Sequence, residues 1–145
     1  MIRALDRNET ESALPLVWNV FCEYEAVNYP ESGKQAFWAA IHSEEYLDML
    51  SAYGAFIDDM LVGIIATRSE GSHVALFFVD GKHQNKGVGR SLWNAVVENS
   101  NAKEITVHSS IFAEDIYKKL GFTQNGDLCD DGGIQYIPMI YKNHR

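Results

Sequence analysis

The segment His73–Val79 (HVALFFV) is an apolar run in which only the first residue is polar. A run of this kind predicts a β-strand buried on both faces, because a strand with one face in water would alternate apolar and polar residues. A sheet covered on both faces needs helices on each side. The segment therefore favours an α/β fold with this strand near the middle of the sheet.

The rest of the chain changes between strand and helix periodicity in an order typical of mixed α/β proteins. Strand patterns are followed by turn residues, as at Asp58-Asp59, which predicts a hairpin. A helix is expected to cross over between the fourth and fifth strands. The expected strands are Ile2–Leu5, Ala55–Ile57, Leu61–Thr67, His73–Val79, Glu104–His108 and Gln135–Tyr141, and the expected helices cover about Ser12–Ala26, Glu31–Ser51 (one or two), the segment after Val88, and Ala113–Leu120.

Three residues qualify these predictions. Ser12 is expected to cap the first helix, which would place Pro15 in the first turn, where its missing N–H costs nothing. Gly121 stops the helix before it. Pro138 favours an edge or irregular position for the last strand, since proline cannot donate to a sheet ladder.

Composition narrows the class of partner. The formal net charge is −8, and an acidic surface repels phosphate backbones, so nucleic acid is not expected as a partner. The same charge favours a cationic small molecule, although acidity also serves solubility alone. Apolar residues make up 46% of the chain, which is enough for a sizeable core in one domain.

The cysteines and the N-terminus predict a cytoplasmic protein. Cys22 and Cys129 are far apart in sequence and form no Cys-x-x-Cys pair, so free thiols in a reducing compartment are expected. The N-terminal segment lacks the basic and apolar regions of a signal peptide. No apolar run has the length of a membrane span, so no membrane association is expected.

Two glycines, Gly87 and Gly89, follow the apolar strand and precede a helix, with Lys86 and Arg90 beside them. Glycine lets the backbone curl closely, and N–H groups in the first turn of the helix then face a bound anion. This geometry suits a pyrophosphate, although a glycine-rich turn also serves simple chain reversal.

Two other phosphate-binding patterns do not fit this segment. A dinucleotide fingerprint needs a third glycine where this chain has Leu92. A Walker loop needs four residues between its glycines and then lysine, whereas five residues separate Gly81 from Gly87 and Val88 follows.

Gln84-x-x-Gly87-x-Gly89 and Ser110-x-x-Ala113-x-x-x-Tyr117-x-x-x-Gly121-Phe122 occur in this order, separated by one helix and one strand. The first resembles the coenzyme A pyrophosphate loop of the GCN5-related N-acetyltransferase (GNAT) family, and the second resembles its C-terminal signature. At Ser110 the family usually has Asn. The resemblance implies one N-acetyltransferase domain over residues 1–145, with a mixed sheet of about six to seven strands flanked by about four helices.

The resemblance also implies that acetyl-coenzyme A (acetyl-CoA) is the cosubstrate and that its acetyl group passes directly to a primary amine, without a metal. Backbone amides of the loop would hold the pyrophosphate, and the backbone groups of Phe78 and Val79 at the edge of the apolar strand would pair with the pantetheine arm. Tyr117 would protonate the departing thiolate. The cofactor-binding residues implied are Phe78, Val79, Gln84, Asn85, Lys86, Gly87, Val88, Gly89, Arg90, Ser110, Ala113 and Tyr117.

An attacking amine must be neutral, whereas its unperturbed pKa is about 8 for an α-amine and about 10.4 for a lysine-like amine. A base near the acceptor is therefore expected. Glu25 continues the apolar stripe of the first helix and is the candidate, with a solvated helix-end carboxylate as its plainer interpretation. Further candidates are Glu23, Tyr29, Trp38, His73 and His108.

The other candidate residues also have purely structural interpretations. Tyr117 is also typical of an apolar helical stripe, and the histidines could be satisfied structural residues. The acidic run Asp127, Asp130 and Asp131 matches no calcium-loop spacing, so it predicts a solvated loop and no metal site.

Two functions of other classes compete with the enzyme. One is a non-catalytic module that binds acyl-CoA as a sensor or regulatory subunit, and the other is an interaction protein that uses the fold without a cosubstrate. The acceptor is expected to be a small-molecule or peptide amine, which the motifs leave open because the acceptor cleft varies within one fold. A homodimer is possible in this family.

Overall fold

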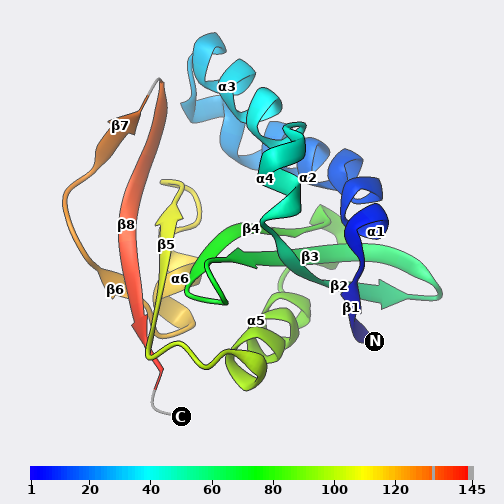
Figure 1. Cartoon of the computed structure of the whole chain (residues 1–145). Helices are drawn as coiled ribbons and strands as arrows, with labels where there is room; N and C mark the ends of the chain where they lie inside the picture. The colour runs from blue at the N-terminus through cyan, green and yellow to red at the C-terminus, as the bar shows by residue number, and fades with distance from the viewer. Residues whose placement is uncertain (132, 144–145) are drawn as a thin grey trace.

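The structure, a computed structural model, describes residues 1–131 and 133–143. Helices fill the N-terminal third and strands dominate the remainder (Figure 1). The elements are β1 (Ile2–Leu5), α1 (Arg7–Ser12), α2 (Leu14–Val20), the π-helix η1 (Phe21–Glu25), the 3-10 turn η2 (Ala26–Asn28), α3 (Glu31–Ile41), α4 (Glu44–Asp48), β2 (Ser51–Ile57), β3 (Met60–Arg68), β4 (His73–Val79), the 3-10 turn η3 (Gly81–His83), α5 (Val88–Asn99), β5 (Glu104–Ser109), α6 (Glu114–Lys119), β6 (Thr123–Gln124), β7 (Cys129–Asp131) and β8 (Ile134–Lys142).

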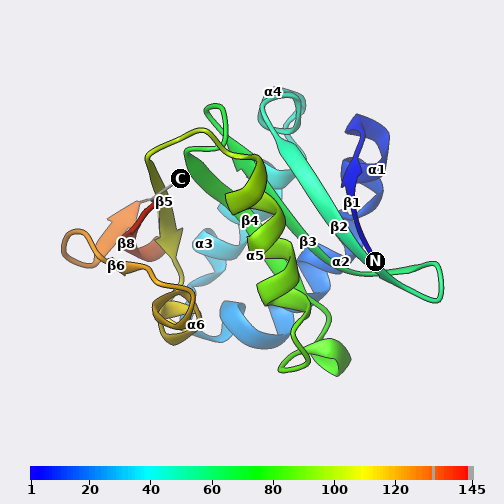
Figure 2. The same cartoon turned by 90° about the horizontal axis from the view of Figure 1, so that it is seen from below.

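The strands form one mixed sheet in the order β1-β2-β3-β4-β5-β8-β6, and β7 pairs with β8 beside β6. Only the β4–β5 pair is parallel among the strands of the described residues. Helix α2 packs on β3 and β4 from one side and α5 packs on them from the other (Figures 1 and 2). The neighbours Ile64 and Ile65 of β3 are both 0% exposed and lie in separate core clusters. The sheet is therefore covered on both faces, as the apolar run in β4 predicted.

The mixed α/β fold is confirmed, and β4 has the bounds read from the sequence. The hairpin between β2 and β3 is also confirmed, because Asp58 and Asp59 both have positive φ, 51° and 64°, as a tight type I′ turn requires. The sheet has eight strands among the described residues, against the six to seven expected. The additional pair, β6 and β7, spans only two and three residues, too few for periodicity to reveal.

The start of the first helix was predicted wrongly. Asp6 and Glu9 form a capping box, a signal that begins a helix by itself, and α1 therefore occupies Arg7–Ser12. Ser12 is the last residue of this helix, and its hydroxyl donates to the Asn8 carbonyl. The second helix starts after Ala13, and Pro15 lies in its first turn, as expected.

Pro138 lies in an interior strand, because β8 pairs with β5 on one side and with β6 and β7 on the other. The predicted edge position of this strand is therefore wrong, whereas the predicted irregular position is confirmed. Pairing to β6 ends at Met139 and pairing to β7 resumes at Tyr136. Asn125 donates to the Pro138 carbonyl at 2.7 Å, so the proline nitrogen faces this break, where the ladder needs no donor.

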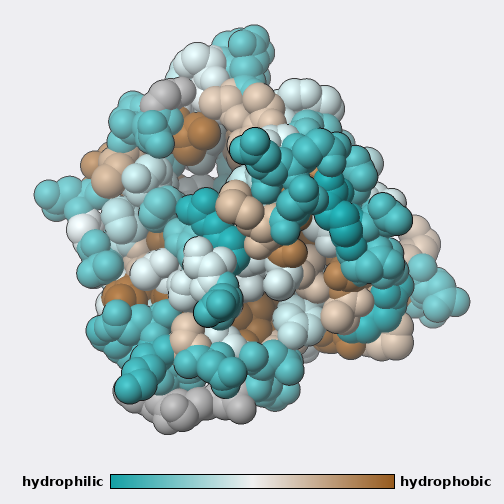
Figure 3. Space-filling model, in the orientation of Figure 1, coloured by the Kyte–Doolittle hydropathy of each residue, from teal (hydrophilic) through white to brown (hydrophobic). Residues whose placement is uncertain are grey.

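The outer surface is largely hydrophilic in the view of Figure 3, with apolar side chains set between polar ones. Within residues 1–131 and 133–143, no helix is both long and apolar enough to cross a bilayer.

Candidate active site

The site begins where β4 and β5 separate. These parallel strands pair only at His73–Thr106 and Val74–Val107, and beyond Val74 they diverge (Figure 1). The remainder of β4 thus has a partner, β3, on one side only. An opening inside the sheet results, and the backbone groups of β4 along one wall have no strand partner there.

The alternation of hydrogen bonds identifies the residues that face this opening. Asp80 donates to the Val62 carbonyl of β3 at 2.8 Å, so Phe78, two residues earlier, also directs its backbone groups to β3. The backbone groups of Phe77 and Val79 point to the opposite side. The Val79 carbonyl there accepts a hydrogen bond from the Gln84 side chain at 3.0 Å.

This geometry corrects the expected backbone pairing by one residue, from Phe78 and Val79 to Phe77 and Val79. A continuous apolar run carries no signal of which residues face which neighbour, so the offset was not readable from the sequence.

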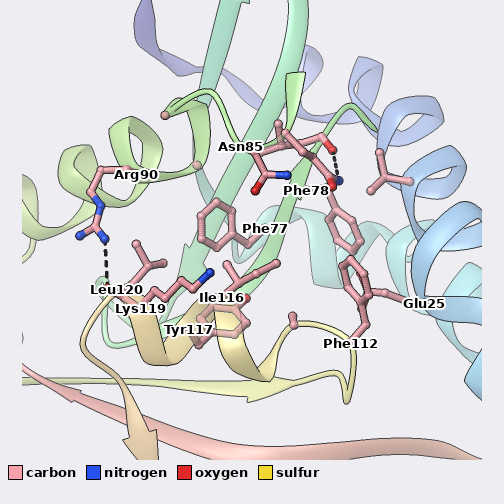
Figure 4. Close-up of a pocket in the computed structure, with 16 residues that line it drawn as sticks. Glu25, Phe77, Phe78, Asn85, Arg90, Phe112, Ile116, Tyr117, Lys119 and Leu120 are labelled. Atoms are coloured by element: carbon pink, nitrogen blue, oxygen red, sulfur yellow. Dashed lines mark hydrogen bonds between the residues drawn. The ribbon is translucent and has the colours of Figure 1, made fainter. Parts of the chain in front are cut away.

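A cavity of about 330 Å³, called the loop cavity below, lies between the end of β4, the start of α5 and α6. Figure 4 shows Phe77, Ile116 and Tyr117 around it, with Arg90 and Lys119 on one side and Glu25 and Phe112 on the other. Its lining is Val20, Glu25, Phe77, Phe78, Val79, Gln84, Asn85, Gly87, Gly89, Arg90, Phe112, Ala113, Ile116, Tyr117, Lys119 and Leu120.

Most residues predicted to bind the cosubstrate line this cavity. Three do not. Lys86 is exposed outside it, the Val88 side chain packs against the core, and Ser110 lines a neighbouring cavity. The sequence reasoning missed six lining residues, since side chains of these types gave no signal beyond ordinary helix and strand patterns. They are Val20, Phe77, Phe112, Ile116, Lys119 and Leu120.

The loop end of the cavity has the geometry that an anion would need. Gly87 has φ 86°, in the left-handed region, and nothing lies within 4 Å of the position where its Cβ would be. It precedes the 12-residue helix α5 without any side-chain cap, so the first N–H groups of that helix keep free donors. Arg90 donates to the Lys119 carbonyl at 3.0 Å and joins α5 to α6 across this end. These features fit a pyrophosphate group.

A second cavity of about 350 Å³, called the hairpin cavity, adjoins the first. It lies toward the β7–β8 hairpin, where Figure 3 shows the surface hollowed beside α3. Its lining is Phe21, Glu25, Tyr29, Phe37, Tyr46, Arg68, Val74, Ala75, Phe77, Phe78, Val107, His108, Ser110, Ala113, Asp131, Ile134, Tyr117 and Tyr136.

The two cavities share five lining residues, two of which can carry acid–base chemistry. The five are Glu25, Phe77, Phe78, Ala113 and Tyr117. A molecule in the loop cavity and another in the hairpin cavity would therefore meet beside a carboxyl group and a phenol.

Glu25 ends the π-helix η1, in which Ala26 donates to the carbonyl of Phe21, five residues back. Such widened turns are frequent at functional sites. Burial raises the pKa of Glu25 to about 7, and a hydrogen bond from the Ser110 hydroxyl opposes this rise. The solvated interpretation of Glu25 is therefore wrong. Ser110 also accepts from the Ala113 N–H at 3.1 Å, so its hydroxyl supports Glu25 and the turn before α6.

Tyr117 is 6% exposed and is held by aromatic contacts on two sides. Its ring lies 5.9 Å from Phe77 and 5.2 Å from Phe122, both edge-on. Burial raises the pKa of Tyr117 above its ordinary value, and the charge of nearby Glu25 adds to this rise. The phenol thus keeps its proton and is positioned between the two cavities.

The other candidate bases differ in position. His108 lines the hairpin cavity, and burial lowers its pKa and that of His73, the latter to about 4. Tyr29 lines the same cavity, and burial raises its pKa to about 12. Glu23 and Trp38 line neither cavity.

Neither cysteine belongs to the site. Cys22 is exposed and Cys129 is half-buried, and neither lines the loop cavity or the hairpin cavity. Among the described residues, no group of three or more His, Cys, Asp or Glu side chains gathers in a way that could hold a metal ion.

The sequence matches the family model of the acetyltransferase (GNAT) domain over residues 22–143. Comparison with curated proteins gives no significant match. Among solved structures, a GCN5-related N-acetyltransferase from Rhodopseudomonas palustris has a TM-score of 0.83 at 16% identity, covering 98% of this chain and 94% of that one.

Two further structures share the fold. PaiA N-acetyltransferase from Thermoplasma acidophilum, solved with coenzyme A, has a TM-score of 0.78 at 19% identity, and 98% of each chain is covered. FeeM, an N-acyl amino acid synthase from uncultured soil microbes, has a TM-score of 0.72 at 18% identity, covering 98% of this chain and 90% of that one. Likenesses at these identities support the fold, while the family rests on the matched domain.

Proposed function

The chain belongs to the GNAT acetyltransferase family, and on this premise we propose that it transfers an acetyl group from acetyl-CoA to a primary amine. The observation that carries the proposal is the meeting of two cavities at Glu25 and Tyr117. One cavity has a helix N-terminus and a glycine turn suited to a pyrophosphate. The other is lined by aromatic and polar side chains and would take the amine.

In the loop cavity, the first N–H groups of α5 and Arg90 would bind the pyrophosphate of the cosubstrate. The backbone groups of Phe77 and Val79 would pair with its extended amide-containing arm, as an added strand does. This would direct the thioester, which supplies an activated acetyl group, toward Tyr117.

On the acceptor side, Glu25 would take the proton of the incoming ammonium. Its pKa of about 7 lies near neutral pH, where a general base is most effective. The amine nitrogen would form its bond to the acetyl carbon as the carbon–sulfur bond breaks, and the Tyr117 hydroxyl would give its proton to the departing sulfur. The second proton that the nitrogen loses on becoming an amide would restore the Tyr117 hydroxyl. No residue is acylated in this sequence of steps.

A non-catalytic acyl-CoA sensor on the same fold is the alternative. The loop cavity alone would serve a sensor, which has no use for a second cavity. The buried carboxyl group shared by both cavities favours catalysis.

The proposal is tested by incubating the purified chain with acetyl-CoA and a panel of amines that includes amino acids, peptides, polyamines and aminoglycosides. Release of free thiol and the mass of the acetylated amine are measured. We expect at least one amine to be acetylated at a rate well above hydrolysis. Binding of coenzyme A without acetylation of any amine would favour the sensor.

Glu25→Gln is expected to lower kcat/KM for the amine by about 10²-fold or more at pH 8, since general base catalysis contributes roughly 10²–10⁴-fold. In the parent protein kcat/KM should fall as the pH drops below about 7, because protonated Glu25 cannot accept a proton. The variant should lose the limb near pH 7 and keep only the rise set by the pKa of the amine itself, about 8 or higher, while its affinity for coenzyme A is unchanged. Kinetics at pH 6–9 check both points.

The same substitution should stabilise the fold in a pH-dependent way. The pKa of Glu25 rises from 4.5 to about 7 on folding, so stability is lost as pH rises between these values, by roughly 3 kcal/mol in all. A glutamine side chain at this position carries no titrating proton and avoids this loss. The free energy of unfolding of the variant, measured in urea, should therefore exceed that of the parent protein most at pH 8 and little at pH 4.5. Glu23→Gln, an exposed neighbour, is the control. Equal effects of both variants would remove Glu25 from the mechanism.

A further inference from the structure

Arg68, at the end of β3, lines the hairpin cavity and is half-buried. The guanidinium groups of the other described arginines have partners. Arg3 and Arg7 pair with carboxylates, and Arg90 donates to a backbone carbonyl. Within residues 1–131 and 133–143, Arg68 alone among the arginines has no ion pair or side-chain hydrogen bond. Its guanidinium therefore keeps donors for an anion that enters the cavity.

The groups around Arg68 are mostly polar and uncharged, and Asp131 is the carboxylate whose charge also acts on His108. Its charge acts on Tyr46, His73 and His108. Burial and the Arg68 charge both lower the pKa of the two histidines, so they are neutral at physiological pH. Tyr46 reaches the Ala75 carbonyl with its hydroxyl at 3.4 Å. This end of the hairpin cavity therefore carries one positive charge and several polar neighbours.

Two carboxyl groups line the same cavity. Glu25 lies where the two cavities meet. Asp131 is exposed, so water and salt screen its charge, and it forms no ion pair with Arg68. The hairpin cavity thus has a cation at one end and the proposed base at the other.

The size of the hairpin cavity suits a compact acceptor. Arg68 lies opposite His73, four residues along β4 from Phe77, which contacts Tyr117. Four residues of a strand span roughly 13 Å between backbone positions, and the side chains of Arg68 and Glu25 both line the cavity that lies between them. The cavity volume of about 350 Å³ is also at the small end of the roughly 300–1,000 Å³ range of small-molecule sites.

We propose that the acceptor is a small zwitterion, an amine that carries a carboxylate a few bonds away as amino acids do, and that Arg68 binds this carboxylate. The inference rests on the proposed function for the amine end of the acceptor. Arginine suits the carboxylate because its planar guanidinium can donate two parallel hydrogen bonds. Polyamines and aminoglycosides, which the acidic net charge of the chain would favour, would instead meet a like charge in the cavity.

The experiment compares the standard L-amino acids with their carboxamides, which keep the amine and side chain but lose the negative charge. Both sets are tested for acetylation, and for binding to the coenzyme A-loaded protein by calorimetry. We expect the preferred amino acid to exceed its carboxamide at least 10-fold in kcat/KM. Arg68→Gln should weaken the amino acid about 10- to 100-fold, as loss of a charged hydrogen bond does, and leave the carboxamide unchanged.

Two further variants sharpen the result. Arg68→Lys keeps the positive charge but cannot donate two parallel hydrogen bonds, so it should recover part of the preference for amino acids over carboxamides. Lys103→Gln removes an exposed charge that lines neither cavity and should change nothing. Each variant is accepted only if its melting temperature and its affinity for coenzyme A match those of the parent protein.

The outcomes separate the two proposals. Amino acids that bind the loaded protein through Arg68 without being acetylated would overturn the proposed function and leave the carboxylate site standing. Two results would overturn the zwitterionic acceptor and leave the proposed acetyltransferase function intact. One is acetylation in which carboxamides equal or exceed amino acids in kcat/KM, and the other is an Arg68→Gln effect of the same size on both sets. Failure of every amino acid to bind would also overturn the zwitterionic acceptor.

Discussion

Replacing Gly89 with valine is expected to abolish binding of coenzyme A while leaving the fold intact. A Cβ at position 89 would lie 3.6 Å from the Phe77 ring and 3.9 Å from Val79, which is ordinary van der Waals contact within the protein. The two further methyl groups of valine would enter the loop cavity beside the first turn of α5. They would occupy the place of the pyrophosphate.

The measurement is the melting temperature with and without coenzyme A. At a ligand concentration about 100 times Kd, binding stabilises the parent protein by about 2.7 kcal/mol, and the variant should show no such gain. Valine costs no more than glycine in a helix interior, so the ligand-free stability should hold. Asn94→Val, on the exposed face of the same helix, is the matched control. A normal ligand-dependent shift in Gly89→Val would contradict the pyrophosphate assignment. Gly87 is a poorer test, because its φ of 86° strains any side chain.

Tyr117→Phe is expected to reduce kcat by roughly 10- to 1000-fold, the scale of general acid catalysis, with coenzyme A affinity unchanged. The substitution removes only the hydroxyl, so the edge-on contacts of the ring with Phe77 and Phe122 remain. Burial raises the pKa of the phenol, which alone would make it a weaker acid. The thiolate forms in the same poorly hydrated place, where burial raises the pKa of the conjugate thiol as well. The proton transfer depends on the difference between the pKa of the phenol and the pKa of the thiol, and burial raises both.

The test is single-turnover kinetics of acetyl transfer, in which product release does not limit the rate. Tyr141→Phe is a matched control, since Tyr141 packs on Trp93 and Phe122 and lines neither cavity. A parental rate in the Tyr117 variant would make this residue a packing tyrosine alone.

The parts of the fold that were readable from the sequence are those in which local chemistry and tertiary structure agree. The apolar run of β4 is covered on both faces, and the Asp58-Asp59 turn has the positive φ that a tight hairpin needs. The failures occur where a short signal competes with a longer pattern. The capping box at Asp6 begins α1 before the apolar periodicity does.

For the site, sequence motifs pointed to the loop that precedes α5 and to the phenol of Tyr117, both of which line the loop cavity, because glycine positions and helical spacing are local. They could not locate Arg68, since its role depends on β3, β4 and the β7–β8 hairpin meeting around one cavity. The raised pKa of Glu25 also arises from packing against segments distant in sequence. Such properties belong to the assembled fold and leave no local pattern.

The divergence of β4 from β5 also bears on how the chain avoids aggregation. Unpaired strand edges are templates on which another chain can add a strand, and proteins usually blunt them with charge, proline or a covering element. The open side of β4 lies within the sheet, because β5 and β8 continue it on the far side. A narrow extended molecule can enter this gap, whereas a strand that brings its own sheet is excluded by the facing wall. The backbone groups of β4 that lack a strand partner are therefore shielded from the sheet edges of other copies of the protein.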